Sequence, residues 1–175
     1  MLSGCRLAAG AAATVLLCLV TGPASGAPLA ASDRQFIDKA TEAGMGEIET
    51  AKLAEHKAAN DQVKQFAARM VHDHTAANDK LRGIAENKGV MPPARLDQAD
   101  QKELGQLDKL SGSSFDKAYM KHQVSDHQKA VKEFGNEAKH AKDPDLRRFA
   151  SETLPVLEEH LKLAKEANAS VASSK

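Results

Sequence analysis

Four long segments of the chain place apolar residues at intervals of three and four, the spacing that gathers them on one face of an α-helix. These segments span residues 33–59, 61–88, 115–140 and 143–164, and a shorter segment with the same spacing spans residues 97–110. An amphipathic helix is stable only when its apolar face packs against another element. The periodicity therefore predicts an all-α protein.

The connections between these helices indicate how they are arranged. Short turns join the first two long helices and the last two, which predicts two antiparallel hairpins. The segments 60–67 and 143–150 share one pattern, in which an N-cap residue is followed by aliphatic, basic, polar, Phe and Ala positions. A duplicated hairpin explains this match. Because a long crossover with a short helix connects the two hairpins, the predicted fold is a ferritin-like four-helix bundle.

The N-terminal residues have the features of a secretory leader. Arg6 precedes the apolar run 11–20, and small residues at 24–27 offer a cleavage site. The run is short for a transmembrane helix, although an uncleaved N-terminal anchor is an alternative. We predict a signal peptide at residues 1–27 and an exported, periplasmic protein.

Removal of the leader changes the chemistry that the chain can carry out. Both cysteines, Cys5 and Cys18, lie within it, so the mature chain is predicted to lack disulfides, thiolate catalysis and cysteine metal ligands. All seven histidines remain. The mature chain is predicted to consist of a short linker at 28–32, a bundle domain at 33–168 and a disordered tail at 169–175.

Composition argues against two classes of function. The 24 Lys and Arg residues equal the 24 Asp and Glu residues, so the chain lacks the excess positive charge that nucleic-acid binding requires. No Trp and a single Tyr leave little aromatic surface for stacking on bases or sugars. We therefore expect no nucleic-acid partner, and no integral membrane insertion once the leader is removed.

When each long helix is phased by its apolar positions, one ionisable residue of each helix points into the bundle. These residues are Glu47, His74, His127 and His160, whereas His72 falls on the opposite face from His74. The distances in sequence from the two turns place Glu47 level with His74, and His127 level with His160. One carboxylate and three imidazoles suit Fe, Zn, Mn or Cu(II), so the four residues are candidate metal ligands.

Other features of the sequence leave alternatives open. Met70 also points inward one turn before His74 and could add a thioether ligand for copper, but a methionine at helical spacing is typical of core packing. Neither His74 nor His160 has a glutamate three residues before it, so the motif of di-iron bundles is absent. The alternative to metal binding is that the inward residues hydrogen-bond to one another in pairs and fix the helix register.

Several blocks of the chain closely resemble one bacterial family, the domain-of-unknown-function family forty-one forty-two. The resemblance implies a ferritin-like bundle over about residues 32–168 and places Glu47, His74, His127 and His160 in the signature blocks of the family. Members are labelled predicted exported or outer-membrane proteins, so it also implies export, with possible outer-membrane association, but no established substrate or cofactor. The segments of this chain that carry the resemblance are residues 36–53, 69–75 and 111–119, and Thr153-Leu154-Pro155 with His160-Leu161.

Three functions remain as hypotheses from the sequence. The first is transition-metal binding (Fe, Zn or Cu) by the inward cluster of an exported helical domain. The second is a non-enzymatic structural or interaction protein of the cell envelope, with an envelope protein as its partner and a role in stress response. The third is a metal-dependent enzyme that consumes peroxide, which rests on analogy with the fold alone.

Overall fold

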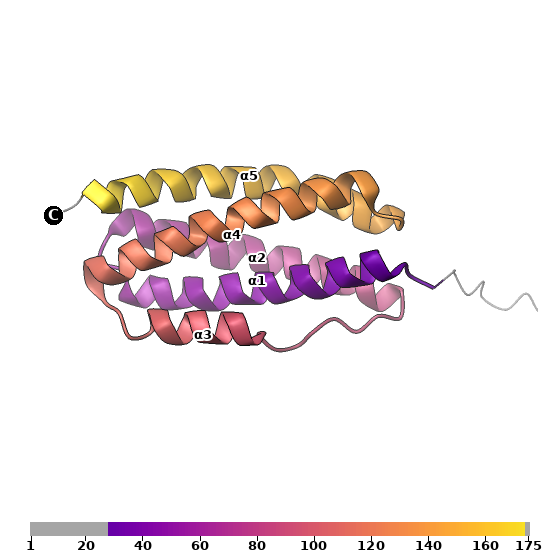
Figure 1. The fold of residues 1–175 in the computed structure, drawn as a ribbon, viewed down its shortest axis with the longest axis horizontal. Helices are drawn as coiled ribbons and strands as arrows, with labels where there is room; N and C mark the ends of the chain where they lie inside the picture. The colour runs from indigo at the N-terminus through magenta and orange to yellow at the C-terminus, as the bar shows by residue number, and fades with distance from the viewer. Residues whose placement is uncertain (1–27, 174–175) are drawn as a thin grey trace, which may run out of the picture.

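The computed structural model describes residues 28–173, and all regular structure in that range is helical (Figure 1). The predicted all-α fold is therefore confirmed, while the predicted signal peptide lies outside the described residues. A short helix, α3, lies between the second and third of four long ones. The helices are α1 (Ala31–Lys57), α2 (Asp61–Asn87), α3 (Gln98–Leu107), α4 (Gly112–His140) and α5 (Pro144–Ser173).

Both ends of the described chain are more helical than the sequence predicts. Helix α1 begins inside the segment 28–32 that was expected to be a linker. Helix α5 continues to Ser173, so the prediction of a disordered tail is wrong for residues 169–173. The reason is that Ala167 and Val171 are 1 % and 3 % exposed, and they extend the apolar face of α5 along the bundle.

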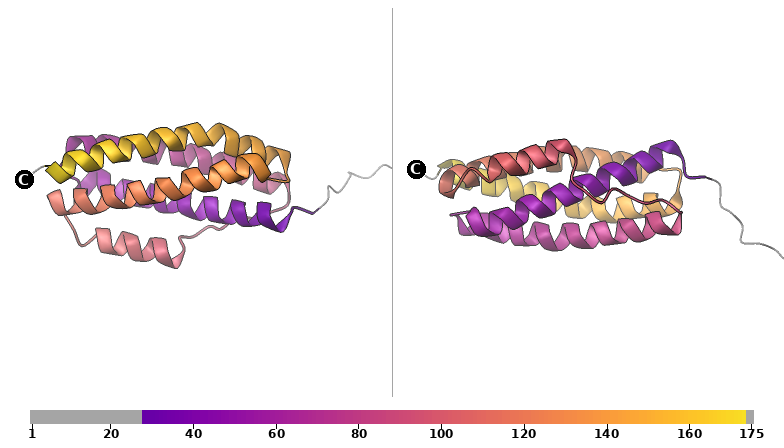
Figure 2. Two further views of the ribbon diagram at one scale, coloured as in Figure 1. Left: turned by 45° about the horizontal axis from the view of Figure 1, so that its top comes forward. Right: turned by 90° about the horizontal axis from the view of Figure 1, so that it is seen from below.

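The long helices form two antiparallel hairpins that pack against each other. Helix α1 packs mainly on α2, and α4 packs mainly on α5. Contacts of α2 with α5 and of α1 with α4 join the hairpins, while α3 lies on the outside against α1 and α4 (Figure 2). The crossover returns along the length of the bundle, so α2 and α4 run in the same direction (Figure 1). A short middle loop could not give this arrangement.

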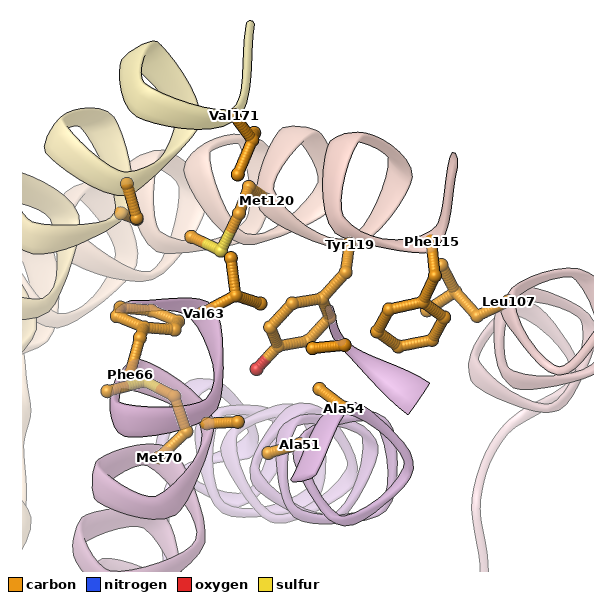
Figure 3. Packing of buried hydrophobic residues seen from close by; sticks show 14 residues of the cluster. Ala51, Ala54, Val63, Phe66, Met70, Leu107, Phe115, Tyr119, Met120 and Val171 are labelled. Atoms are coloured by element: carbon orange, nitrogen blue, oxygen red, sulfur yellow. The ribbon is translucent and has the colours of Figure 1, made fainter. Parts of the chain in front are cut away.

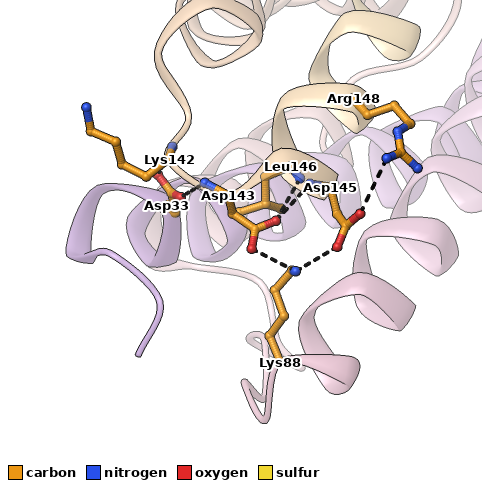
Figure 4. A network of polar contacts seen from close by, with 7 residues as sticks. All are labelled: Asp33, Lys88, Lys142, Asp143, Asp145, Leu146 and Arg148. Carbon is orange, nitrogen blue, oxygen red and sulfur yellow. Dashed lines mark hydrogen bonds and ion pairs between the residues drawn. The ribbon is translucent and has the colours of Figure 1, made fainter. Parts of the chain in front are cut away.

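Each hairpin turn is held by an aspartate from the other hairpin. The carboxylate of Asp116 in α4 accepts hydrogen bonds from the backbone amides of residues 59 and 60, at 3.1 and 3.0 Å. The carboxylate of Asp33 in α1 accepts from the amides of residues 142 and 143, at 3.2 and 2.6 Å (Figure 4). The same shift in numbering, 83 residues, relates the two aspartates and the two turns. This reciprocal arrangement supports a duplicated hairpin.

An ion-pair network ties the end of α2 to the start of α5. Asp143 caps α5 by accepting from the backbone amides of Asp145 and Leu146. The ammonium of Lys88 lies 2.7 Å from the Asp143 carboxylate and 2.8 Å from that of Asp145 (Figure 4). The turn of the second hairpin is therefore fixed to both helices of the first.

The buried apolar residues form two separate clusters along the bundle axis. The Tyr119 cluster surrounds the α1–α2 turn, where the rings of Phe115 and Tyr119 stack at 5.8 Å (Figure 3). The Phe149 cluster surrounds the α4–α5 turn, where Phe36 meets Phe134 edge-on at 5.1 Å. In every long helix, a stretch that belongs to neither cluster separates the two. The bundle thus has two apolar ends and a polar middle.

Candidate metal centre

The polar middle of the bundle contains the four residues predicted from helix phasing. Glu47 comes from α1, His74 from α2, His127 from α4 and His160 from α5. Each lies between the residues that its helix contributes to the Tyr119 and Phe149 clusters. The sequence does not determine whether the Glu47/His74 pair and the His127/His160 pair lie at the same height along the bundle. They do for the histidines, because one packed group contains rings from α2, α4 and α5.

Three imidazoles meet at this point. The ring centroids of His74 and His127 are 5.6 Å apart, those of His74 and His160 are 5.4 Å apart, and those of His127 and His160 are 5.3 Å apart. One ring nitrogen of each residue lies within 4.8 Å of the other two. His74 Nε2, His127 Nε2 and His160 Nδ1 are buried and have no hydrogen-bond partner within residues 28–173. Three unpartnered nitrogens in one small volume need an explanation.

In two of the rings the other nitrogen makes a hydrogen bond, which fixes the tautomer of the ring. His127 Nδ1 lies 3.0 Å from the backbone carbonyl oxygen of Gln123, which can only accept, so Nδ1 carries the proton. His160 Nε2 donates to the Asp73 carboxylate at 2.8 Å. In the neutral rings, His127 Nε2 and His160 Nδ1 therefore hold lone pairs. Histidines that bind metals are usually oriented in the same way, because their other ring N–H donates to a carboxylate or a carbonyl oxygen.

The electrostatics of the site favour neutral imidazoles. Burial lowers the pKa of His74 to about 3 and that of His127 to about 4, and the neighbouring rings add to both shifts. Burial also lowers the pKa of His160, although the hydrogen bond and charge of Asp73 oppose this. Hydrogen bonds from His72 and His160 lower the pKa of Asp73 to about 2 in spite of its partial burial. At neutral pH the three rings are uncharged bases beside a charged aspartate.

Glu47 lies beside the three imidazoles, toward the outer side of His127. Its Oε1 is 3.8 Å from His127 Nδ1, the protonated nitrogen, and its Oε2 accepts from Gln123 Nε2 at 2.6 Å. Burial raises the pKa of Glu47 to about 8, although the Gln123 hydrogen bond opposes this. The structure therefore brings together the three predicted histidines and places the predicted glutamate behind one of them.

A small cavity borders two of the three imidazoles. Its volume is about 60 Å³, and its lining includes His74, His127 and Glu47. This is enough for a metal ion with a water or another small fourth ligand. Met70, the other inward residue considered from the sequence, is fully buried in the Tyr119 cluster near Phe66 (Figure 3).

Comparison with known protein families identifies the family to which the chain belongs. The family described as "Domain of unknown function (DUF4142)" matches residues 18–167, which is most of the chain. The chain belongs to the DUF4142 family. The resemblance noted in the sequence blocks is thus confirmed. No curated protein matches the sequence of this DUF4142 protein.

A solved structure resembles the fold of this DUF4142 protein. It is the crystal structure of a DUF305 fragment from Deinococcus radiodurans, with a TM-score of 0.71 and 13 % sequence identity. The match covers 81 % of this chain and 98 % of the fragment. At this identity the likeness shows a shared helical fold and nothing about a site. Within residues 28–173, no helix is both long and apolar enough to cross a membrane.

Sequence reasoning missed Asp73, the partner of His160. Asp73 stands between His72 and His74, and its carboxylate contacts His72 Nδ1 at 2.7 Å and Arg69 Nε at 3.3 Å. The Arg69–Asp73 spacing of four residues predicts a surface ion pair, and nothing local points toward α5. Only the packing of α2 against α5 brings Asp73 to His160.

Proposed function

We propose that this DUF4142 protein binds one divalent transition-metal ion through His74, His127 and His160. The observation that carries the proposal is the packing of three imidazoles from three helices, each of which has a buried ring nitrogen without a partner. Two of these nitrogens hold lone pairs because Gln123 and Asp73 occupy the opposite nitrogens. Lone pairs cannot hydrogen-bond to each other, whereas a cation between them would be stabilised by both.

The ligand set favours zinc or copper. Neutral imidazole suits both ions, and among divalent ions of the first row copper binds such sites most tightly. Zinc bound by three histidines keeps a fourth position for water. Zinc–nitrogen bonds of about 2.0–2.1 Å require nitrogens about 3.4 Å apart in a tetrahedron, and the ligand atoms of this cluster lie within 4.8 Å of one another.

A purely structural role for the cluster has less support. Such a role requires that the inward rings satisfy one another, but each has a buried nitrogen without a partner. An unsatisfied buried group costs about 1–3 kcal/mol. Three such groups in one layer are a poor way to fix helix register when apolar residues of similar size would pack there.

Calorimetric titration of Zn²⁺ and Cu²⁺ into metal-free protein tests the proposal. We expect one tightly bound ion per chain in the wild type, and we expect this tight binding to be at least about 100-fold weaker in a His74→Ala/His127→Ala double variant. The matched control is His56→Ala/His140→Ala, which removes two exposed histidines from other positions. Equal binding by both double variants would refute the site, provided that circular dichroism shows both to be helical.

We also infer that the protein is exported to the periplasm. The inference is supported by the apolar run and small residues within positions 1–27 and by the restriction of both cysteines to that segment. N-terminal sequencing of protein purified from its native cells should begin between residues 25 and 28. A mature protein that still begins at Met1 and stays in the cytoplasm would contradict the inference.

A further inference from the structure

A second group of metal-ligating side chains lies outside the helical core, where α3 covers α4. It consists of Glu103 from α3 with His122 and Asp126 from α4, and one ligand atom of each lies within 4.8 Å of the others. We propose that these three residues form an outer site for a hard divalent cation of the Mn²⁺ type. The outer site is separate from the histidine centre, and only its suggested role in loading that centre rests on the proposed function.

The geometry of the group is that of a chelating site. His122 and Asp126 are four residues apart on α4 and therefore project from the same side of the helix. Glu103 Oε1 approaches His122 Nδ1 to 3.3 Å from the opposite side. The side chains of Glu103, His122 and Asp126 are 22 %, 39 % and 32 % exposed, so an ion can reach them from solvent. Two carboxylates with one imidazole suit manganese better than three imidazoles do.

The group borders a strongly acidic groove between α1, α3 and α4. The groove has a volume of about 260 Å³, and its lining includes seven carboxyl groups against two lysines. Gln123 also lines it, is only 1 % exposed, and has an Oε1 without a hydrogen-bond partner in the described chain. That oxygen is a further unpartnered acceptor beside the groove. Gly46 makes room for the groove's Asp100, because a Cβ there would lie 2.8 Å from the Asp100 carboxyl carbon.

The charges in the groove are incompletely balanced without a cation. Burial and the carboxylates of Asp97 and Glu103 raise the pKa of Asp100 to about 6, and burial also raises the pKa of Glu103. Lys129 pairs with Asp126 Oδ1 at 2.8 Å but makes no ion pair with Asp100 or Glu103. A divalent ion at Glu103, His122 and Asp126 would relieve the repulsion that these shifts report.

The outer site lies next to the histidine centre. Asp126 directly precedes His127, and Asp126 and Glu47 line both the acidic groove and the cavity beside His74 and His127. The groove that the outer group borders and the inner cavity therefore have side chains in common in their walls. This placement suits a site that concentrates cations before they pass inward.

Titration with Mn²⁺ alone, followed by electron paramagnetic resonance, tests the outer site. The variant is Glu103→Gln/His122→Gln, which leaves Asp126 and the three inner histidines in place. The control is Glu133→Gln/His140→Gln, which removes one groove carboxylate and one α4 histidine outside the group. We expect one bound Mn²⁺ per chain in the wild type and in the control, and at least about tenfold weaker binding in the variant.

A His127→Leu protein makes failure of this proposal distinguishable from failure of the histidine centre. We expect it to keep the Mn²⁺ signal. In the Glu103→Gln/His122→Gln background, where Zn²⁺ cannot use the outer site, we expect the added His127→Leu change to abolish Zn²⁺ binding. If Mn²⁺ binds equally to the variant and the control, the groove attracts cations only diffusely and the outer site is refuted. If Mn²⁺ binding instead disappears in His127→Leu, the manganese was bound at the inner centre and the outer site is likewise refuted. Zn²⁺ binding that is unchanged when His127→Leu is added to the Glu103→Gln/His122→Gln background would overturn the histidine centre alone.

Discussion

The pH dependence of folding stability provides a direct test of the buried, neutral histidines. The perturbation is acidification of metal-free protein from about pH 7.5 to pH 5, in the wild type and in His127→Leu. The pKa of His127 is about 4 in the folded protein, against about 6.5 for an ordinary imidazole. Between these values the unfolded chain binds more protons than the folded chain, so stability is lost as the pH falls below about 6.5.

The expected magnitude follows from the same two pKa values. At pH 5 the unfolded imidazole is almost fully protonated, while His127 in the folded protein is almost fully neutral. The difference is about 1.5 pH units, which corresponds to about 2 kcal/mol of unfolding free energy. The wild type should therefore lose about 2 kcal/mol more than His127→Leu on acidification. Urea denaturation followed by circular dichroism, with a chelator present, measures both losses.

The comparison with a variant is necessary because several carboxyl groups, Glu47 and Glu137 most strongly, respond in the opposite direction. The pKa of Glu47 is raised to about 8 and that of Glu137 to about 7. Their folded forms bind more protons than their unfolded forms above about pH 4.5, so both add stability on acidification. A flat wild-type profile would thus not by itself contradict buried histidines. Glu47 and Glu137 remain in His127→Leu, and their contributions largely cancel in the difference.

A control substitution separates titration from core packing. Met120→Leu alters a fully buried position of the same helix with little change of volume and adds or removes no ionisable group. It should lose as much stability on acidification as the wild type does. If His127→Leu also follows the wild type to within about 0.5 kcal/mol, His127 is not a buried neutral base, and the electrostatic argument for the centre fails.

Two further predictions concern other parts of the fold. Burial, with the charges of Asp33 and Glu133, raises the pKa of Glu137 to about 7, so folding stability falls as the pH rises from about 4.5 to 7. In urea titrations at pH 8, Glu137→Gln should therefore have a free energy of unfolding up to about 3 kcal/mol higher than that of the wild type. At pH 4 the variant should show no gain. A Cβ on Gly44 would lie 2.2 Å from Asn78 Oδ1, so Gly44→Ala should lower folding stability by about 1–3 kcal/mol. Gly83 has open space around it, so Gly83→Ala should raise folding stability by up to about 1 kcal/mol in the same urea titration. Equal effects of the two alanines would contradict the close packing of α1 on α2.

Helix phasing predicted the inward histidines because it depends only on local geometry. Each residue advances about 100° around a helix, so apolar neighbours determine whether a side chain faces the core. That reasoning separated His74 from His72, whose side chain is 83 % exposed. It did not depend on how the helices pack, which is why it succeeded for three different helices.

Tertiary packing, which the sequence does not express locally, determined the other features of the centre. Glu47 faces inward as predicted, but the offset between α1 and α4 places it beside His127 Nδ1 instead of among the unpartnered nitrogens. Asp73 occupies a surface position by phase and reaches His160 only because α2 lies against α5. Helical periodicity predicts the direction in which a side chain points around its helix axis, but it does not predict the axial offset between helices.

A duplicated hairpin explains why the backbones of the two halves match, but the three proposed histidine ligands are not repeated between the halves. The 83-residue shift relates His127 to Gly44, His160 to Ala77 and His74 to Leu157. Gly44, Ala77 and Leu157 line the cavity of about 60 Å³ that borders the imidazoles of His74 and His127. Each ligand position therefore has a repeat counterpart that is apolar and helps to form the wall of the cavity.

Histidines at all six related positions would place six polar rings in one layer that lacks partners for them. With three ligands and three small or apolar counterparts, the layer can hold a single ion beside a small cavity. The two hairpins thus make different contributions to this layer, and the three histidines are the number that the proposed tetrahedral ion with one open position requires.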